Sequence, residues 1–305
     1  MNLIPHLCVL VNAFFWGLCW IPLLDFTRLG LHPLGITLLS YGLLAGLLLL
    51  FEKRSILFFF RSKPLVFLGI SYGLTNVFFN WAITEGEIVR VVFLFYLMPI
   101  WSAIFAKILL NESLGILGLC RISFALLGIF LLVVAEEFHK NGLSGFSLSI
   151  MASDFFAMLG GIFFGLGNVF LRMLKTENSI FRTFSIFFGS FLVSAVILAL
   201  IWLVDPSVFF GKIYPFHLGY FSLNLTYSLI VFSIVLGIAN FCLQYGGSKL
   251  MVQTTSMLML MEIVVATIST TYYGENTLTY VGFLGGLIVV MASSFSIFYK
   301  GFKSS

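Results

Sequence analysis

Polar and aromatic side chains recur at four-residue intervals inside two apolar stretches of this chain. Residues four apart lie on one face of a helix, so each set forms a single stripe. Amides donate and accept hydrogen bonds, and Trp and Tyr rings stack on flat or positively charged groups, so the stripes carry the chemistry of solute binding. The first stripe is Asn12, Trp16 and Trp20, and the second is Tyr72, Asn76 and Asn80.

The surroundings of the second stripe occur again 164 residues later. Residues 73–81 and 237–245 match Gly on Gly, amide on amide and aromatic on aromatic, and the repeated amides are Asn240 and Gln244. An unpaired amide that faces lipid costs about 2–7 kcal/mol, so these amides must face other helices or a watery cavity. Hydrogen bonding between helices is one interpretation. Recurrence at equivalent places favours the other, a binding site between the repeats.

Glu262 is the residue that membrane burial penalises most. It lies about eleven residues into an apolar stretch, with no basic neighbour at helical spacing. An acid near the bilayer centre costs roughly 2.5–3.5 kcal/mol when charged, so burial favours its neutral form. Three interpretations follow: a protonated acid bonded to a facing helix, contact with a substrate ammonium, or a proton that leaves and returns during transport. Glu262 is therefore a candidate for both substrate binding and proton coupling.

Composition places these residues in a membrane. Of the 305 residues, 60% are hydrophobic and only 9% are charged, and the mean hydropathy is +1.11. No soluble domain of this size covers so much apolar surface with polar groups. Apolar stretches near the ~20 residues that cross a bilayer predict ten spanning helices. They are residues 4–24, 32–51, 65–84, 91–110, 115–135, 150–171, 183–204, 225–245, 251–273 and 278–298.

The positions of Lys and Arg predict the orientation of the spans. With the N-terminus inside, 12 of the 16 basic residues fall on the cytoplasmic side, so both termini are expected in the cytoplasm. Five spans per half is an odd number, so the second half enters from the opposite face. The sequence therefore predicts an all-α, multi-pass protein of the inner (cytoplasmic) membrane, with ten transmembrane helices in two inverted five-helix repeats, residues 1–140 and 141–305.

Short motifs in the first and fourth spans carry a family resemblance. The first span contains Asn12 and Trp16-Gly17, and in the fourth Pro99 is followed thirteen residues later by Glu112 at the end of the span. In these features the chain resembles the EamA branch of the drug/metabolite transporter superfamily. The resemblance implies transport of small organic metabolites or amino acids, often outward.

The second half carries the same motif in altered form. Glu262-Ile263 stands where the family has Glu-Pro, and Gly274-Glu275 closes the span. Because the second proline is missing, the resemblance does not predict a proline hinge in the ninth span.

We expect the substrate to contact polar and aromatic residues on the helices that surround the pseudo-two-fold axis. Aromatic rings at these places would stack on a ligand ring or ammonium, which favours an amino acid or an aromatic metabolite. The predicted binding residues are Asn12, Trp16, Trp20, Tyr72, Asn76, Asn80, Trp81, Tyr96, Asn168, Asn240, Gln244, Tyr245 and Glu262.

These features favour a secondary transporter that exports an amino acid or related compound by alternating access around a central cavity. An alternative within the class is an uptake or exchange carrier for a nucleotide-like or other cofactor metabolite. A channel or a non-transporting membrane scaffold is an alternative of another class. An enzyme is not expected, because all four His residues fall at span ends or in loops, with no clustered catalytic set.

The expected partners are a small-molecule substrate and the lipid bilayer. The four cysteines lie in or beside apolar spans without metal spacing, so neither a metal nor a cofactor is expected. The net charge of +4 is spread over short loops and forms no patch, so no nucleic-acid partner is expected. We expect a monomer, with a dimer as the alternative.

Overall fold

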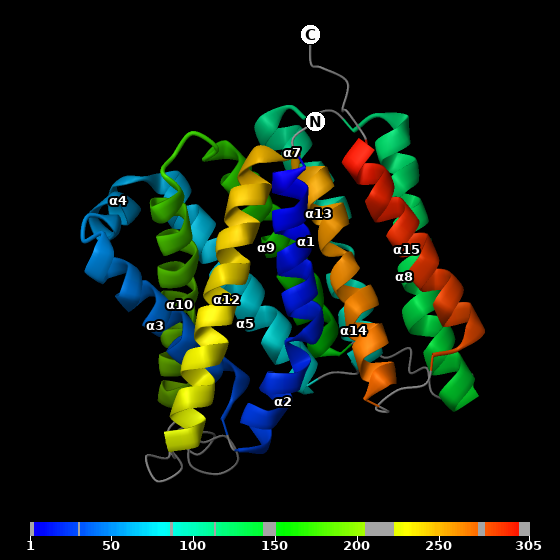
Figure 1. Ribbon diagram of the computed structural model, residues 1–305, viewed down its shortest axis with the longest axis horizontal. Coiled ribbons are helices and arrows are strands. Elements are labelled where there is room, and N and C mark those ends of the chain that lie inside the picture. Colours follow the sequence, from blue (N-terminus) through cyan, green and yellow to red (C-terminus); the bar gives the residue numbers. More distant parts are fainter. Residues whose placement is uncertain are drawn as a thin grey trace.

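The computed structural model describes residues 3–29, 31–85, 88–112, 114–142, 151–204, 223–273 and 278–298. Within these ranges the chain forms helices and no strand, and the helices stand side by side in one bundle (Figure 1). The helices are α1 (Ile4–Leu18), α2 (Trp20–Arg28), α3 (Pro33–Phe51), α4 (Ser55–Arg61), α5 (Lys63–Glu85), α6 (Ile88–Phe95), α7 (Met98–Leu110), α8 (Ile116–Asn141), α9 (Ala152–Met173), α10 (Ser179–Val204), α12 (Leu223–Lys249), α13 (Val252–Met259), α14 (Met261–Tyr272) and α15 (Tyr280–Phe298).

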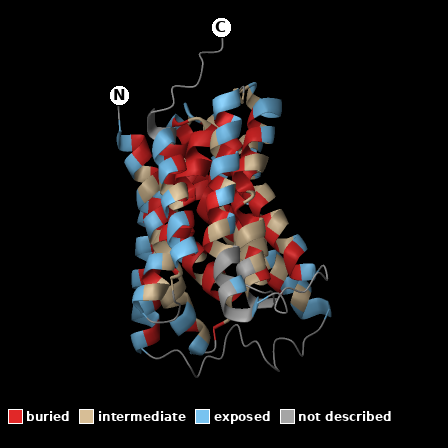
Figure 2. Ribbon diagram, turned by 90° about the vertical axis from the view of Figure 1, so that its right-hand side faces the viewer, coloured by how far each residue is buried: buried red, intermediate tan, exposed pale blue. Residues whose placement is uncertain are grey.

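The outer surface of the bundle is apolar. Large hydrophobic side chains such as Phe51, Val204 and Leu223 are exposed there, while buried residues gather along the middle of the bundle (Figure 2). Water does not favour such a surface, whereas lipid does. In the described part of the chain, nine helical segments are long and apolar enough to cross a membrane. The chain is therefore a multi-pass membrane protein.

The tenth predicted span, residues 278–298, contains α15, a helix of 19 residues. α15 packs along α8 at one side of the bundle (Figure 1). The two helices approach closely, because a Cβ atom added to Gly285 would lie 2.6 Å from the Gly128 carbonyl oxygen. Small residues of this kind allow close contact between membrane helices.

Two of the predicted spans are each divided in two by a proline. Proline has no N–H, and its ring clashes with the carbonyl four residues earlier. Pro22 stands four residues after Leu18, where α1 ends, and Pro99 stands four residues after Phe95, where α6 ends. The sequence analysis treated each of these spans as one continuous helix, which is wrong at these two places.

The ninth span is also divided, although it contains no proline. α13 ends at Met259 and α14 begins at Met261, and the Ile263 N–H donates to the Leu260 carbonyl at 3.2 Å, a bond of the tighter 3₁₀ type. Gly17 of α1 lies against this break, since a Cβ atom there would come within 2.7 Å of the Glu262 carbonyl oxygen. The break therefore occurs without the second proline of the family motif.

The start of α1 and the end of α15 lie at the same end of the bundle (Figure 1). We call this the basic end, because most Lys and Arg residues lie at the helix ends and connections that share it. Those described are Lys53, Arg54, Arg61, Lys63, Lys107, Arg121, Arg172, Lys175, Arg182 and Lys249. Several residues used in the sequence analysis lie outside the described residues, namely Lys212, Gly274, Glu275, Lys300 and Lys303.

Candidate functional site

A central cavity lies at the level of the helix breaks, between helices from both halves of the chain. The space between its lining atoms, including the part that is open to the surroundings, is about 460 Å³. Five of the predicted binding residues line it: Trp16, Tyr72, Asn76, Asn240 and Glu262. The lining residues that the sequence analysis did not select are Tyr41, Thr75, Phe79, Phe95, Phe164, Leu243 and Met259.

Tyr41 of α3 connects the amides that the sequence repeats. It is buried, and its hydroxyl lies beside the side chains of Asn76 on α5 and Asn240 on α12. Asn76 also donates to the Ser190 Oγ at 3.2 Å, and Asn240 donates to the Leu236 carbonyl at 2.9 Å. One tyrosine thus joins equivalent amides of the two halves at the cavity wall.

Sequence analysis missed Tyr41 although a signal was present. Thr37 precedes Tyr41 by four residues, so the two form a short polar stripe on α3 like those on the first and third spans. In the structure the Asn80 Nδ2 donates to the Thr37 Oγ1 at 2.9 Å. The stripe on α3 therefore faces the stripe on α5, which explains how the predicted Asn80 is held.

Glu262 lies in the first turn of α14, immediately after the break in the ninth span. It keeps part of its surface open and lines the cavity, whereas Ile263 and Val264 beside it are buried. The hydroxyl of Tyr96, which follows α6 at the break in the fourth span, lies beside its carboxyl group. Tyr96 and Glu262, two of the predicted binding residues, therefore bring the two broken spans together.

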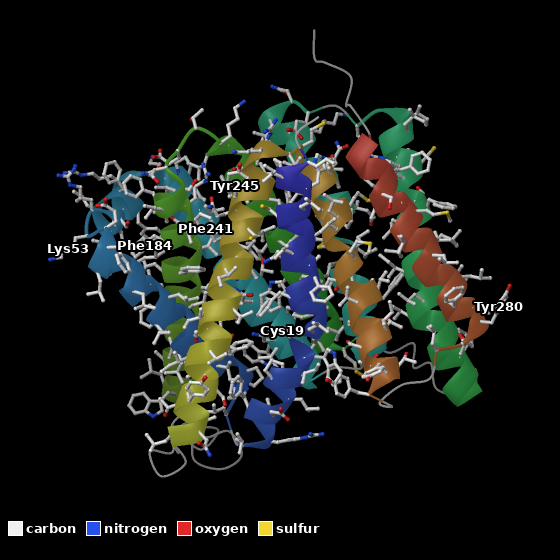
Figure 3. All side chains as sticks on the ribbon, in the orientation of Figure 1. Cys19, Lys53, Phe184, Phe241, Tyr245 and Tyr280 are labelled. Atoms are coloured by element: carbon white, nitrogen blue, oxygen red, sulfur yellow. The ribbon has the colours of Figure 1, made fainter. Side chains whose placement is uncertain are left out.

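A second, smaller cavity adjoins the central one and shares Trp16, Tyr41 and Asn76 with it. The predicted Asn80 lines this second cavity. Its remaining lining residues lie further from the basic end, between α1 and α2, on α2, in the first turns of α3 and on α12, and Figure 3 shows Cys19 near the middle of the bundle. They are Cys19, Leu23, Ile36, Thr37, Ser40, Phe232 and Leu236. Together the two cavities extend from the centre toward the end opposite the basic end.

Toward the basic end, a chain of buried hydrogen bonds lies next to the central cavity. The Tyr72 hydroxyl donates to the Asn168 Oδ1 at 2.8 Å, and the Asn168 Nδ2 donates to the Ser256 Oγ at 3.5 Å. The Ser256 hydroxyl donates to the Ser102 Oγ at 2.5 Å. These residues come from α5, α9, α13 and α7, so the predicted Asn168 helps to join four helices on this side of the cavity.

An ionic cluster lies beyond this chain, at the basic end itself. Glu112, which closes the fourth-span motif, accepts a hydrogen bond from the Arg172 Nε at 3.4 Å and another from the Val252 N–H at 3.2 Å. The Arg172 Nη1 donates to the Ser248 carbonyl at 3.2 Å. The cluster links the ends of α7, α9 and α12 to the start of α13, and so holds both halves together at this end.

Two predicted amides lie outside both cavities. Asn12 is fully buried on α1, and neither atom of its amide has a hydrogen-bond partner. Gln244 is also fully buried, and its Oε1 accepts a hydrogen bond from the Nε of Arg182 at 2.9 Å. The guanidinium of Arg182 also donates to the carbonyls of Leu174 and Glu177, so Gln244 completes the coordination of a buried cation.

Three predicted aromatic residues contact protein groups away from the cavities. The Trp20 Nε1 donates to the Ser269 Oγ at 2.9 Å, and Trp81 stacks on Phe156 with ring centroids 5.0 Å apart. Tyr245 lies on α12 toward its C-terminal end (Figure 3), and the Lys249 Nζ lies 3.7 Å from its ring centroid. These positions indicate packing between helices.

Comparison with known proteins supports the resemblance seen in the motifs. The sequence profile described as the EamA-like transporter family matches residues 3–134. Residues 3–134 form an EamA-like transporter domain. The predicted family is thus confirmed over this part of the chain, and it is a family of transporters rather than of enzymes.

The likeness in fold extends beyond the EamA-like domain. One solved crystal structure of another protein aligns over 96% of this chain and 96% of that chain, with a TM-score of 0.71 and 15% sequence identity. At that identity the match shows a shared fold alone. No curated protein matches this chain. The EamA-like domain supplies Trp16, Tyr41, Tyr72 and Asn76 to the central cavity, whereas Glu262 comes from the part of the chain that follows it.

Proposed function

We propose that this protein is a secondary transporter that exports a small organic metabolite, an amino acid or a related compound, across the cytoplasmic membrane. The observation that carries the proposal is the central cavity, which is lined by polar and aromatic groups from both halves of the chain. In transporters built from repeats, substrates bind near the bilayer midplane between the repeats. The EamA-like domain at residues 3–134 supports the same function class.

Alternating access around this cavity is supported by how the helices pack. α5 packs on α9 and α10, and α12 packs on α1 and α3. The fourth span, α6 and α7, packs on α9, and the ninth span, α13 and α14, packs on α1. If the first span is paired with the sixth, the second with the seventh and each later span in the same way, every contact in the first half corresponds to one in the second. For example, the contact of α5 with α9 corresponds to the contact of α12 with α1. An inverted pair of five-helix repeats has this property.

The arrangement of cavities favours a carrier over a channel. The two cavities extend toward the end opposite the basic end, while the Tyr72–Ser102 hydrogen-bonded chain and the Glu112–Arg172 cluster lie toward the basic end. We assign the basic end to the cytoplasm, because cytoplasmic loops are enriched in Lys and Arg. Under this assignment the arrangement supports a state in which the cavities extend toward the outside, and transport would then require the contacts at the basic end to separate.

The cavity lining disfavours the nucleotide-like alternative. None of the residues that line either cavity is Lys, Arg or His. Proteins recognise phosphate groups mainly through Arg, Lys and clustered backbone N–H groups.

Counterflow in proteoliposomes tests the transport proposal. A growth-resistance screen against toxic amino acids and their analogues would first supply a substrate. We then expect uptake of the labelled compound to saturate and to be accelerated by unlabelled compound on the other side of the membrane, as a carrier requires. Trp16→Leu, in the cavity, should reduce the rate, and Trp202→Leu, on the exposed face of α10, should not. Flux that neither saturates nor shows counterflow would indicate a channel or a scaffold.

A further inference from the structure

The central cavity contains one carboxyl group and no basic partner for it. Glu262 is the single charged residue among those that line the two cavities. The helices that pack against α14, namely α1, α13 and α15, contain no Asp, Glu, Lys or Arg. A carboxylate in the membrane interior requires a counter-ion. Because no lining residue is basic, the counter-ion of an ionised Glu262 has to come from a bound ligand.

Aromatic rings surround the remaining space. Phe79 and Phe95 have ring centroids 4.4 Å apart, and Phe164 lies 6.0 Å from Tyr72 and 6.1 Å from Phe95. Trp16 and Tyr41 also line the cavity. The faces of such rings attract cations, and their apolar surface packs against a hydrocarbon or aromatic body.

The cavity has no cationic receptor for a carboxylate. The amides of Asn76 and Asn240 each use one N–H to donate to the Ser190 Oγ and the Leu236 carbonyl and keep a second N–H, but none of the lining residues is Lys, Arg or His. The positive end of the α14 dipole faces the carboxylate of Glu262 in its own first turn. In the first turn of α7, Pro99 has no N–H to donate. A zwitterionic amino acid would therefore bury its carboxylate without a cationic partner, in a cavity that already holds the carboxyl group of Glu262.

We propose that the central cavity binds a protonated amine on an apolar or aromatic body that lacks a free carboxylate, with Glu262 as its counter-ion. The inference rests on the proposed function, because it takes the central cavity as the substrate site. It narrows the substrate class from amino acids and related compounds to amines, such as those formed when an aromatic amino acid loses its carboxyl group.

A matched pair of ligands tests this specificity in the purified full-length protein. Phenethylamine and phenylalanine share the ring and the ammonium and differ by the carboxylate. Binding is measured in detergent by the shift in thermal unfolding temperature over a concentration series. We expect phenethylamine to stabilise the protein at concentrations at which phenylalanine does not. Glu262→Gln should weaken phenethylamine binding by about tenfold or more, since a charge-assisted contact is lost.

Control variants separate loss of binding from loss of folding. Glu262→Asp keeps the charge and should retain phenethylamine binding, and Glu52→Gln alters an acid at the α3–α4 connection and should leave binding unchanged. Size-exclusion chromatography checks that each variant is folded. Phenylalanine binding as tight as that of phenethylamine, no binding of phenethylamine, or equal phenethylamine binding by folded Glu262→Gln would each overturn the inference.

The transport assay distinguishes this inference from the function on which it rests. If phenylalanine shows counterflow but phenethylamine does not bind, the protein is a transporter and the proposed amine site is wrong. If phenethylamine binds in a way that depends on Glu262 but no bound compound shows counterflow, the amine site is supported and the proposed transport function is wrong.

Discussion

At the scale of single residues, equivalent amides of the two halves have different roles. Asn76 and Asn240 meet at the Tyr41 hydroxyl beside the central cavity. Asn80 bonds to Thr37 in the second cavity, whereas Gln244, at the position equivalent to Asn80, holds the buried Arg182. Sequence repetition therefore identified buried polar positions, but the groups that each amide meets come from other helices.

Substitution of the amides should separate these roles. Asn240→Leu removes a group from the cavity wall, and we expect it to reduce counterflow severalfold with little loss of folded protein. Gln244→Leu leaves the Arg182 Nε buried without its acceptor, which costs on the order of 1–3 kcal/mol. The yield of monodisperse protein and the transport rate per folded molecule distinguish the two effects. An equal loss of folded protein in both variants would contradict the assignment.

A second prediction at this scale concerns proton coupling at Glu262. If transport exchanges a proton on this carboxyl for substrate, Glu262→Gln should keep the fold and flatten the dependence of transport on pH. The titratable groups that face Glu262 are Cys19 and Tyr96, and both are ordinarily protonated near neutral pH.

The measurement is the counterflow rate over a range of pH on both sides of neutrality, for the wild type and for Glu262→Gln. If folded Glu262→Gln shows the same pH profile as the wild type, Glu262 does not couple transport to protons. Its role would then be that of a substrate contact or a packing group.

At the scale of elements, α9 is tied at both of its ends to the divided fourth span. Asp154 in its first turn pairs with Arg90 in α6 at 2.5 Å, and Arg172 in its last turn pairs with Glu112 just after α7. The break between α6 and α7 lies between these two ties. We expect that a movement of the fourth span against α9 that keeps one tie intact would bend the span at Tyr96 and Leu97.

The cap of α3 gives a prediction about pH and stability. The His32 Nδ1 accepts the Leu34 N–H at 3.2 Å, and burial lowers the pKa of His32 to about 4 from its ordinary value near 6.5. Between these values the unfolded chain binds the proton more readily, so the stability of the protein should fall as pH decreases from about 6.5 to about 4. Above about pH 6.5 the contribution of His32 to stability should not change with pH.

The matched variant for this prediction is His32→Asn, which keeps a neutral cap acceptor. Thermal unfolding in detergent from pH 7.5 to 4.5 should show a smaller decrease in unfolding temperature for the variant than for the wild type. Identical pH profiles would mean that His32 does not titrate differently in the folded and unfolded states.

At the scale of the whole molecule, the start of α1 and the end of α15 share the basic end (Figure 1). We predict that a reporter fused after Ser305 is cytoplasmic and that one inserted near Asn141 is external, because Lys and Arg concentrate on the cytoplasmic side. Protease protection or reporter fluorescence in intact cells measures both. Finding both reporters on one side would contradict the inverted five-plus-five arrangement.

Sequence reasoning predicted the helical class, and nine of its ten spans correspond to helices of the described residues that are long and apolar enough to cross a membrane. Apolar length is a local property that the bilayer imposes. Sequence reasoning also found Trp16, Asn76, Asn240 and Glu262, whose cost in lipid is visible in the sequence. It treated each span as one helix, and so missed the breaks.

Sequence reasoning missed other residues of the cavity for a different reason. Phe79, Phe95 and Phe164 line the cavity, yet the chain contains 37 Phe and no local pattern separates these three from those that face lipid. Trp81 and Tyr245 were selected for their ring type and lie elsewhere, since their environment depends on which neighbouring helix faces them.

Glu262 also has no counterpart in the other half. The offset that aligns Asn76 with Asn240 places Met98, a fully buried apolar residue, opposite Glu262. Two identical inverted halves would give a carrier whose inward-facing and outward-facing forms are related by a two-fold rotation and have equal free energy. An acid on one half alone helps to remove that degeneracy. Under the proposed arrangement, the ionisation of a single carboxyl group then biases both the resting population of the two forms and the orientation of the bound amine.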